Sequence, residues 1–235
     1  MKDNKMDKKI IVVSGASSGI GLSICHAFSE KYEVIGVGRR ELEGKLSFTY
    51  FSGIDVANKS DIKKVSRMID ISRVYGVIAC AGIASMNHFF LMPESTRRKL
   101  MDVNFHGAVN LIETFVKPMI KAKQGRIIGV STIAVPLMLE GEAAYAASKA
   151  ALETYIKVIS NEVAEWNITA NTIRPSATET FLLAGLDKDQ VDGVLNRQTI
   201  KRKLNMDEIV SLVEHLISDQ ASAITGQSIT LGLSS

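Results

Sequence analysis

A tyrosine and a lysine four residues apart offer the clearest chemistry in this sequence. Tyr145 and Lys149 stand in a stretch, residues 143–166, whose apolar spacing predicts a helix. Residues four apart share one helical face, so the phenol and the ammonium are expected to be neighbours. A phenol with an ordinary pKa of about 10 acts as an acid or base near neutral pH only when something stabilises the phenolate, and a nearby cation does so. Taken alone, such a pair is also compatible with a solvated helix surface.

A glycine-rich segment indicates where a nucleotide would bind. Residues 14–21 read Ser-Gly-Ala-Ser-Ser-Gly-Ile-Gly and follow the apolar run 9–13. Glycines permit a tight turn and a close approach to a pyrophosphate, while the start of the next helix offers unpaired N–H groups to the anion. The strand-loop-helix context favours dinucleotide binding over a purely structural turn. The residues assigned to this loop are Gly15, Ser17, Ser18, Gly19, Ile20 and Gly21.

The end of the second apolar run bears on which dinucleotide would bind. Residues 34–38 lead into Arg39 and Arg40, and no carboxylate follows until Glu41. An acid at this point would bind the ribose 2′-hydroxyl of NAD, whereas an arginine suits the 2′-phosphate of NADP. NADP(H) is therefore the preferred cofactor, with NAD(H) possible. The alternative is an ordinary solvated turn.

The elements that would position these residues alternate along the chain. Such alternation of short apolar runs and amphipathic stretches is typical of parallel strands joined by crossover helices. The predicted strands are residues 9–13, 33–37, 46–51, 76–79, 125–131, 169–173 and 228–231. The predicted helices are residues 20–31, 59–71, 95–121, 143–166 and 207–217. We therefore predict a Rossmann-type, doubly wound α/β fold, with a seven-stranded parallel sheet in a three-layer α/β/α sandwich.

Length and composition favour one domain over residues 1–235. Its 46% hydrophobic and 23% charged residues are typical of a globular protein. Residues 1–8 are expected to form a flexible tail. Residues 181–205 lack clean periodicity, and are expected to form a substrate lid or, equally, an ordinary helix pair.

Several function classes are disfavoured by the same composition. The net charge of +3 is spread along the chain, so nucleic acid is a poor candidate partner. Two distant cysteines suggest neither a disulfide framework nor a zinc site, and no metal ligands are assigned. No apolar run approaches the length of a membrane span. A cytoplasmic protein that does not bind membranes is expected.

Further motifs make the sequence resemble the short-chain dehydrogenase/reductase (SDR) family over nearly its whole length. Asp55 and Val56 resemble the family's adenine contact, and Asn104 falls at its catalytic asparagine. Tyr145 and Lys149 match its Tyr-x-x-x-Lys pair. Other matching positions are Cys80, Ala81 and Gly82 at its Asn-Asn-Ala-Gly motif, Pro175, Thr178 and Thr180 within its Pro-Gly-x-x-x-Thr segment, and 224–226 before its last strand.

The resemblance implies roles for these residues. The tyrosine would exchange a proton with the substrate oxygen, the lysine would lower the pKa of the tyrosine and hold the ribose, and Asn104 would support a water-linked proton path. A hydroxyl would steady the reacting oxygen. The resemblance also implies the strand order 3-2-1-4-5-6-7, and a homodimer or homotetramer assembled through the long helices.

The hydroxyl position departs from the family pattern. The family's serine stands thirteen residues before the tyrosine, which is Thr132 here, while Ser131 lies one residue earlier. Strand neighbours point to opposite faces, so only one hydroxyl can face Tyr145. Thr132 is favoured, and a one-residue bulge would instead select Ser131. Both are kept as catalytic candidates. Cys80 and Ser176 also replace family residues.

The expected function is an NADP(H)-dependent oxidoreductase that transfers hydride between nicotinamide and a small carbonyl or alcohol substrate. Two alternatives stay open. One is a reductase of 3-oxoacyl groups on a carrier protein, for which Arg197, Lys201, Arg202 and Lys203 could receive a phosphate. The other is a non-catalytic NADP(H)-binding sensor or interaction subunit.

Overall fold

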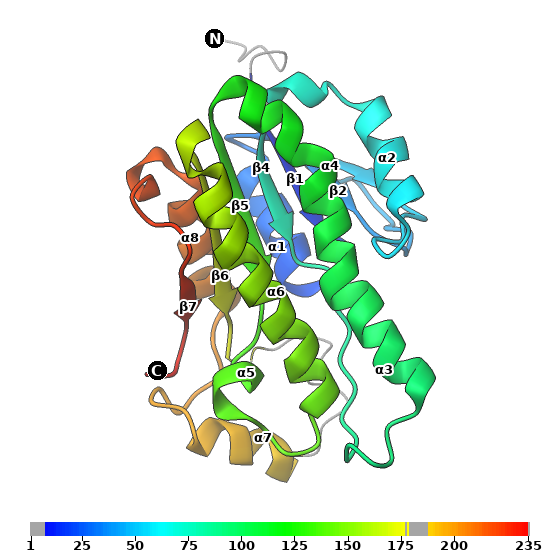
Figure 1. Cartoon of the computed structure of the whole chain (residues 1–235), viewed down its shortest axis with the longest axis vertical. Helices are drawn as coiled ribbons and strands as arrows, with labels where there is room; N and C mark the ends of the chain where they lie inside the picture. Colours follow the sequence, from blue (N-terminus) through cyan, green and yellow to red (C-terminus); the bar gives the residue numbers. More distant parts are fainter. Residues whose placement is uncertain (1–7, 177, 179–187, 235) are drawn as a thin grey trace.

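The computed structural model describes residues 8–176, 178 and 188–234, and these are built around one parallel sheet (Figure 1). The strand order is β3-β2-β1-β4-β5-β6-β7, which confirms the expected fold class and topology. The strands are β1 (Ile10–Ser14), β2 (Glu33–Val37), β3 (Thr49–Phe51), β4 (Val74–Ala79), β5 (Gly125–Val130), β6 (Ile168–Arg174) and β7 (Ser228–Thr230).

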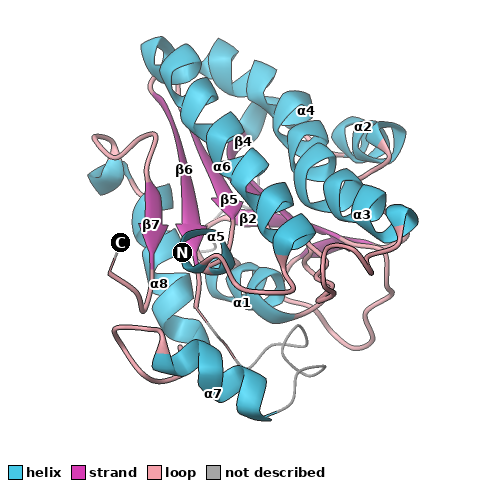
Figure 2. Ribbon diagram, turned by 60° about the horizontal axis from the view of Figure 1, so that its bottom comes forward, coloured by secondary structure: helices cyan, strands magenta, loops and turns pink. Residues whose placement is uncertain are grey.

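Helices cover both faces of the sheet because its central strands are apolar on both sides. In β1, Ile10 and Val12 pack toward one face, while Ile11 and Val13 pack toward the other. The first face carries α2 (Lys59–Met68), α4 (Gly107–Ala122) and α6 (Ala143–Val163), and the second carries α1 (Gly19–Phe28) and α8 (Met206–Ile217). Figure 2 shows these layers on either side of the strands.

The long helix expected at 95–121 is divided by a π-helical turn. Helix α3 (Glu94–Met101) leads into the π turn Asp102–His106, which leads into α4. The strand expected at 46–51 is shorter, because β3 pairs only with β2 at the edge of the sheet. Single 3-10 turns lie at Ile71–Arg73, Ala164–Trp166 and Asp219–Ala221.

Two short helices not expected from periodicity lie beyond the carboxyl ends of the strands. They are α5 (Ala134–Leu137) and α7 (Lys188–Asn196), at the lower end of the molecule in Figure 1. Helix α7 falls inside the expected lid at 181–205, of which residues 181–187 lie outside the described part. Residues 1–7 of the expected tail also lie outside it.

All the loops that matter for the site leave the same end of the sheet. In a parallel sheet the carboxyl ends of the strands meet at one edge, and ligands bind there. No helix in the part of the chain that the structure describes is long and apolar enough to cross a membrane.

Candidate active site

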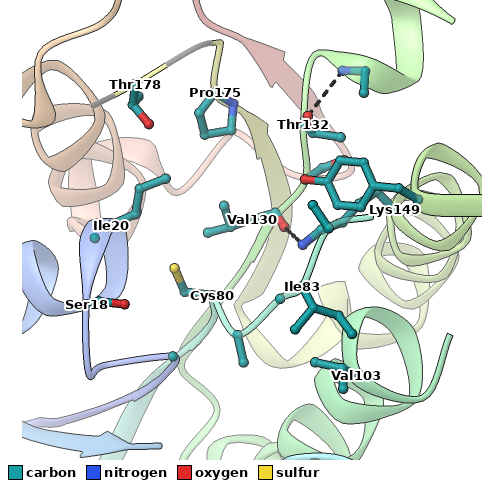
Figure 3. A pocket seen from close by; sticks show the side chains of 18 of the residues that line it. Ser18, Ile20, Cys80, Ile83, Val103, Val130, Thr132, Lys149, Pro175 and Thr178 are labelled. Atoms are coloured by element: carbon teal, nitrogen blue, oxygen red, sulfur yellow. Dashed lines mark hydrogen bonds between the residues drawn. The ribbon is translucent and has the colours of Figure 1, made fainter. Parts of the chain in front are cut away.

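A cavity of about 940 Å³ lies at the carboxyl ends of β1, β4, β5 and β6. In Figure 3, Ser18, Ile20 and Cys80 lie on one side of it, and Thr132 and Lys149 lie on the other. Of the described residues assigned to the site from the sequence, only Gly21 and Asn104 do not line the cavity. Thr180, also assigned, lies outside the described residues.

The glycine loop is shaped by close backbone contacts. Gly15 has φ +68°, and a Cβ there would lie 2.8 Å from the backbone of Ala81. A Cβ on Gly21 would lie 2.4 Å from the carbonyl oxygen of Gly15, so only a glycine at position 21 lets α1 pack this closely against the loop. The Ser14 hydroxyl accepts hydrogen bonds from the N–H groups of Cys80 and Ala81, both at 3.1 Å. This arrangement leaves a bare backbone cradle at the start of α1, which fits a pyrophosphate.

Arg40 lies over the hydroxyl groups of the same loop. Its Nη2 donates to Ser18 Oγ at 2.7 Å and to Ser17 Oγ at 3.3 Å. The Tyr50 hydroxyl donates to the Arg40 carbonyl at 2.6 Å and holds this turn against β3. Arg39 lines the same end of the cavity. Two guanidinium groups and two hydroxyls are therefore available to a phosphate ester at this end.

Lys149 and Tyr145 are both buried in the cavity wall, on one face of α6. Lys149 Nζ donates to the Val130 carbonyl at 2.7 Å (Figure 3). Burial lowers the pKa of Lys149 to about 8, against the opposing effects of Cys80 and Glu153. Burial raises the pKa of Tyr145 to about 12; a hydrogen bond with Thr132 lowers it and Glu142 raises it. The expected lowering of the Tyr145 pKa by Lys149 is not seen, because burial dominates and the ammonium is turned to Val130.

The two candidate hydroxyls at the end of β5 point to different partners. Ser131 Oγ donates to Glu153 Oε1 at 2.5 Å, and Glu153 is also held by Arg174 through contacts of 2.8 and 2.5 Å. Thr132 Oγ1 instead accepts from the Ala134 N–H at 3.2 Å, and the Thr132 side chain lies near enough to the phenol to lower the pKa of Tyr145. The geometry thus directs Thr132 to the phenol and Ser131 away from it.

Asn104 lies in the π turn and is completely buried beside the cavity. Its Oδ1 accepts from the Ile83 N–H at 2.8 Å, while its Nδ2 donates to the Ile83 carbonyl and to Ser148 Oγ, both at 2.9 Å. A Cβ on Gly82 would lie 3.1 Å from Lys149 Nζ and 3.3 Å from Asn104 Oδ1. The amide therefore joins the loop after β4 to α6 next to Lys149. A π turn at such a place is common at functional sites.

Cys80 turns its sulfur into the cavity (Figure 3). Burial raises the pKa of its thiol to about 11, although Lys149 acts in the opposite direction. The thiol is therefore protonated at neutral pH and suits packing better than nucleophilic chemistry. Among the described residues, no group of three or more His, Cys, Asp or Glu side chains could hold a metal ion.

Three residues of this site were missed from the sequence. Glu153 stands four residues after Lys149, on the same helical face, but a glutamate in a helix is usually solvated. Its partner Arg174 comes from β6, and nothing in the sequence pairs the two. Glu142 lines the cavity one helical turn before Tyr145, a spacing that the sequence does show.

The parallel order of the strands, the glycine cradle and the tyrosine-lysine helix face together define a dinucleotide-binding oxidoreductase of the Rossmann class. The family model described as short chain dehydrogenase matches residues 9–191. The chain therefore belongs to the short-chain dehydrogenase family, whose members are oxidoreductases that act on CH–OH and C=O groups with NAD(P)(H).

Individual relatives cover nearly the whole chain. The 3-oxoacyl-[acyl-carrier-protein] reductase FabG of Vibrio cholerae is 30% identical over 95% of this chain and 96% of its own. The NAD-dependent glycerol dehydrogenase of Listeria innocua is also 30% identical, over 98% of this chain and 94% of its own. Among solved structures, Thermoplasma acidophilum aldohexose dehydrogenase superposes with a TM-score of 0.86 at 24% identity, covering 96% of this chain and 94% of that one. At this identity, the similarity to the aldohexose dehydrogenase structure shows a shared fold alone.

Proposed function

We propose that this protein reduces a small carbonyl substrate with NADPH, within one oxidoreductase domain. Thr132 lies close enough to Tyr145 to lower its pKa, and both residues line the cavity that the glycine loop also lines; this pairing is the observation that carries the proposal. A bound NADPH supplies the hydride. Tyr145 gives its proton to the substrate oxygen, and Thr132 donates a hydrogen bond to the same oxygen. Lys149 stabilises the phenolate left behind once its ammonium turns from the Val130 carbonyl toward the phenol. Asn104 keeps the loop after β4 in place beside Lys149.

The pKa of Tyr145 supports reduction as the favoured direction near neutral pH. With a pKa of about 12 the phenol is protonated, which is the form that an acid needs. Alcohol oxidation needs the phenolate as a base, and only a small fraction is available until alkaline pH. Ala134, Leu139 and Ile83 pack around the ring and contribute to this burial.

Arg40 supports the preference for NADPH over NADH. Its guanidinium is aimed at the Ser17 and Ser18 hydroxyls, where a 2′-phosphate would accept charge-assisted hydrogen bonds. In Arg40→Ala, the ratio of the Kd for NADPH to the Kd for NADH should rise about tenfold or more, as expected for loss of a hydrogen bond to a charged group. Fluorescence titration with both nucleotides measures this ratio. An unchanged ratio would contradict the preference.

A 3-oxoacyl-carrier reductase is the second candidate, favoured by the similarity to FabG. Two of the basic residues considered for carrier binding are already engaged. Arg197 donates to the Leu137 carbonyl at 2.6 Å, and Arg202 forms a bidentate pair with Glu208 at 2.8 and 2.7 Å. Their engagement weakens this candidate.

Absorbance at 340 nm during incubation with NADPH separates the candidates. Turnover of simple ketones supports the main proposal, whereas turnover of 3-oxoacyl thioesters alone supports the second. Nucleotide binding without turnover of any carbonyl compound would support the non-catalytic alternative.

We further infer a homodimer or homotetramer in the cytoplasm, assembled through α4 and α6. Val158 on α6 is 52% exposed, and an apolar side chain on a long outer helix suits burial against a second copy. Light scattering of the purified protein measures the assembly state, and Val158→Asp should weaken the assembly.

A further inference from the structure

Glu142 lies immediately before α6, one turn from Tyr145. Its backbone N–H donates to the Leu139 carbonyl, and its own carbonyl accepts from Ala146. The side chain does not cap the helix, and its carboxylate has no hydrogen bond or ion pair within the part of the chain that the structure describes. Because the residue lines the cavity, this carboxylate faces space that a substrate would enter.

Apolar residues lie near Glu142. Its backbone N–H bonds the Leu139 carbonyl, a Cβ on the preceding Gly141 would lie 3.1 Å from Met86, and Leu139 and Ile83 pack around Tyr145. Partial burial raises the pKa of Glu142, and the charge of Glu142 raises the pKa of Tyr145. The two side chains therefore interact across the cavity wall. Asp55, another acid that lines the cavity within the part of the chain that the structure describes, follows β3 near the glycine loop.

A ligand entering this end must displace water from the carboxylate. Burying a polar group without replacing its hydrogen bonds is costly, and the cost is greatest for a charged group. An alkyl or acyl chain filling the space would leave Glu142 desolvated without a donor. A substrate hydroxyl would replace the lost water with a charge-assisted hydrogen bond.

The charge of Glu142 acts on the Tyr145 phenol, so the carboxylate lies within electrostatic reach of the group that would hold the carbonyl oxygen. A substrate whose carbonyl oxygen is held by Tyr145 therefore brings its neighbouring carbons into the part of the cavity that Glu142 also lines.

We propose that Glu142 is a specificity-determining residue that selects hydroxylated carbonyl substrates, with a hydroxyl close to the carbonyl group, by accepting a hydrogen bond from that hydroxyl. The proposal rests on the proposed carbonyl reduction and narrows its substrate class. It places polyol-type hydroxyketones above acyl chains as substrates of this protein.

The test compares 1-hydroxy-2-butanone with 2-butanone, which differ by one hydroxyl. For the wild-type protein with NADPH, kcat/KM should be higher for the hydroxyketone. In Glu142→Leu, the ratio of the two kcat/KM values should fall by about tenfold to a hundredfold, the range for a lost hydrogen bond to a charged group. The ratio is the right measure, because any effect of Glu142 on Tyr145 acts equally on both ketones and cancels.

Glu140→Leu provides a matched control two residues earlier. Glu140 is exposed and does not line the cavity, so this variant should keep the ratio within about twofold of wild type, well below the effect of losing a charged hydrogen bond. A ratio that is unchanged in Glu142→Leu, or that falls equally in both variants, would overturn the proposal.

Binding measurements separate this proposal from the proposed reduction. If the wild type reduces neither ketone, calorimetric titration of the protein–NADP⁺ complex with 1-hydroxy-2-butanone becomes the readout. Binding that is lost in Glu142→Leu but kept in Glu140→Leu would support the role of Glu142 while rejecting catalysis. Absence of binding to the wild type would reject the role of Glu142.

Discussion

The two ends of the cavity are built by different means. At the nucleotide end, the shape comes from the backbone of a few consecutive residues: the left-handed Gly15 and the Ser14 hydroxyl that holds the next loop. At the substrate end, it comes from side chains that are far apart in sequence, such as Ser131, Glu153 and Arg174. The backbone shape of the nucleotide end tolerates few residue types. The shape of the substrate end depends on contacts between side chains from different elements.

This difference predicts distinct kinds of damage. A change at the nucleotide end should act on cofactor affinity, because it alters the cradle itself. A change at the substrate end should act on turnover or on stability, depending on whether the side chain faces the cavity or the buried ion pair.

Tyr145→Phe should have the largest effect. Removing the proton donor should lower kcat by about a thousandfold, within the range for general acid catalysis, while the Kd for NADPH should change by only a few fold. Steady-state kinetics and fluorescence titration measure the two quantities. Unchanged turnover would reject the assigned role of Tyr145, and an equally large loss of affinity would remove the contrast between the two ends.

Thr132→Ala and Ser131→Ala form a matched pair at the substrate end. Loss of the Thr132 hydroxyl should lower kcat by about a hundredfold, as for removal of one donor to a reacting oxygen. Ser131→Ala should lower the free energy of unfolding by about 1 kcal/mol, because one buried hydrogen bond is lost while Glu153 keeps Arg174. Kinetics and urea unfolding of both variants provide the check. A loss of kcat in Ser131→Ala rather than in Thr132→Ala would identify Ser131 as the catalytic hydroxyl instead.

Gly15→Ala and Gly53→Ala test the nucleotide end. Both glycines have positive φ, at +68° and +70°, but only a Cβ at position 15 meets neighbouring atoms. Gly15→Ala should weaken NADPH binding by about tenfold or more, because backbone strain of 1–3 kcal/mol and the contact with Ala81 distort the cradle. Gly53→Ala shares the strain and should lower stability without this loss of affinity. Equal affinities of the two variants for NADPH would contradict the proposal that the backbone at Gly15 forms the nucleotide-binding cradle.

The pH dependence of carbonyl reduction should show the smallest effect. Lys149 has a pKa lowered to about 8, and its charged form stabilises the phenolate as it forms. Activity should therefore be constant below pH 7 and fall as Lys149 loses its proton, to about one tenth at pH 9. The profile of kcat/KM for NADPH reports groups of the free enzyme, so it is the profile to measure. A profile that stays flat to pH 10 would contradict the low pKa of Lys149.

Much of the fold was predictable because its signals are local. The apolar runs identified all seven strands, and the motifs after them matched the family in order and spacing. The prediction of one continuous helix at 95–121 was wrong, because a π turn around Asn104 divides it and periodicity does not show such a turn. The short helix α5 was missed because four residues carry too little periodic pattern, and α7 lies within residues 181–205, where a helix pair was one of two alternatives.

Side-chain direction was harder to predict than position. Alternation along the strand expected at 125–131 predicted that only one of Ser131 and Thr132 faces Tyr145, and the spacing to Tyr145 favoured Thr132. The buried Glu153–Arg174 pair, which engages Ser131, joins residues 21 apart and leaves no local signal. The raised pKa of Tyr145 was also unforeseen, because burial rather than charge decides it.

From its amino-acid order alone, this chain specifies a parallel sheet, a glycine cradle and a tyrosine-lysine helix face, because each depends on residues close together along the backbone. Only tertiary packing decided which hydroxyl reaches the phenol, how deeply the phenol and ammonium are buried, and that Glu142 faces the cavity. These properties depend on distance and solvent exclusion between separate elements, and neither quantity is carried by residue spacing.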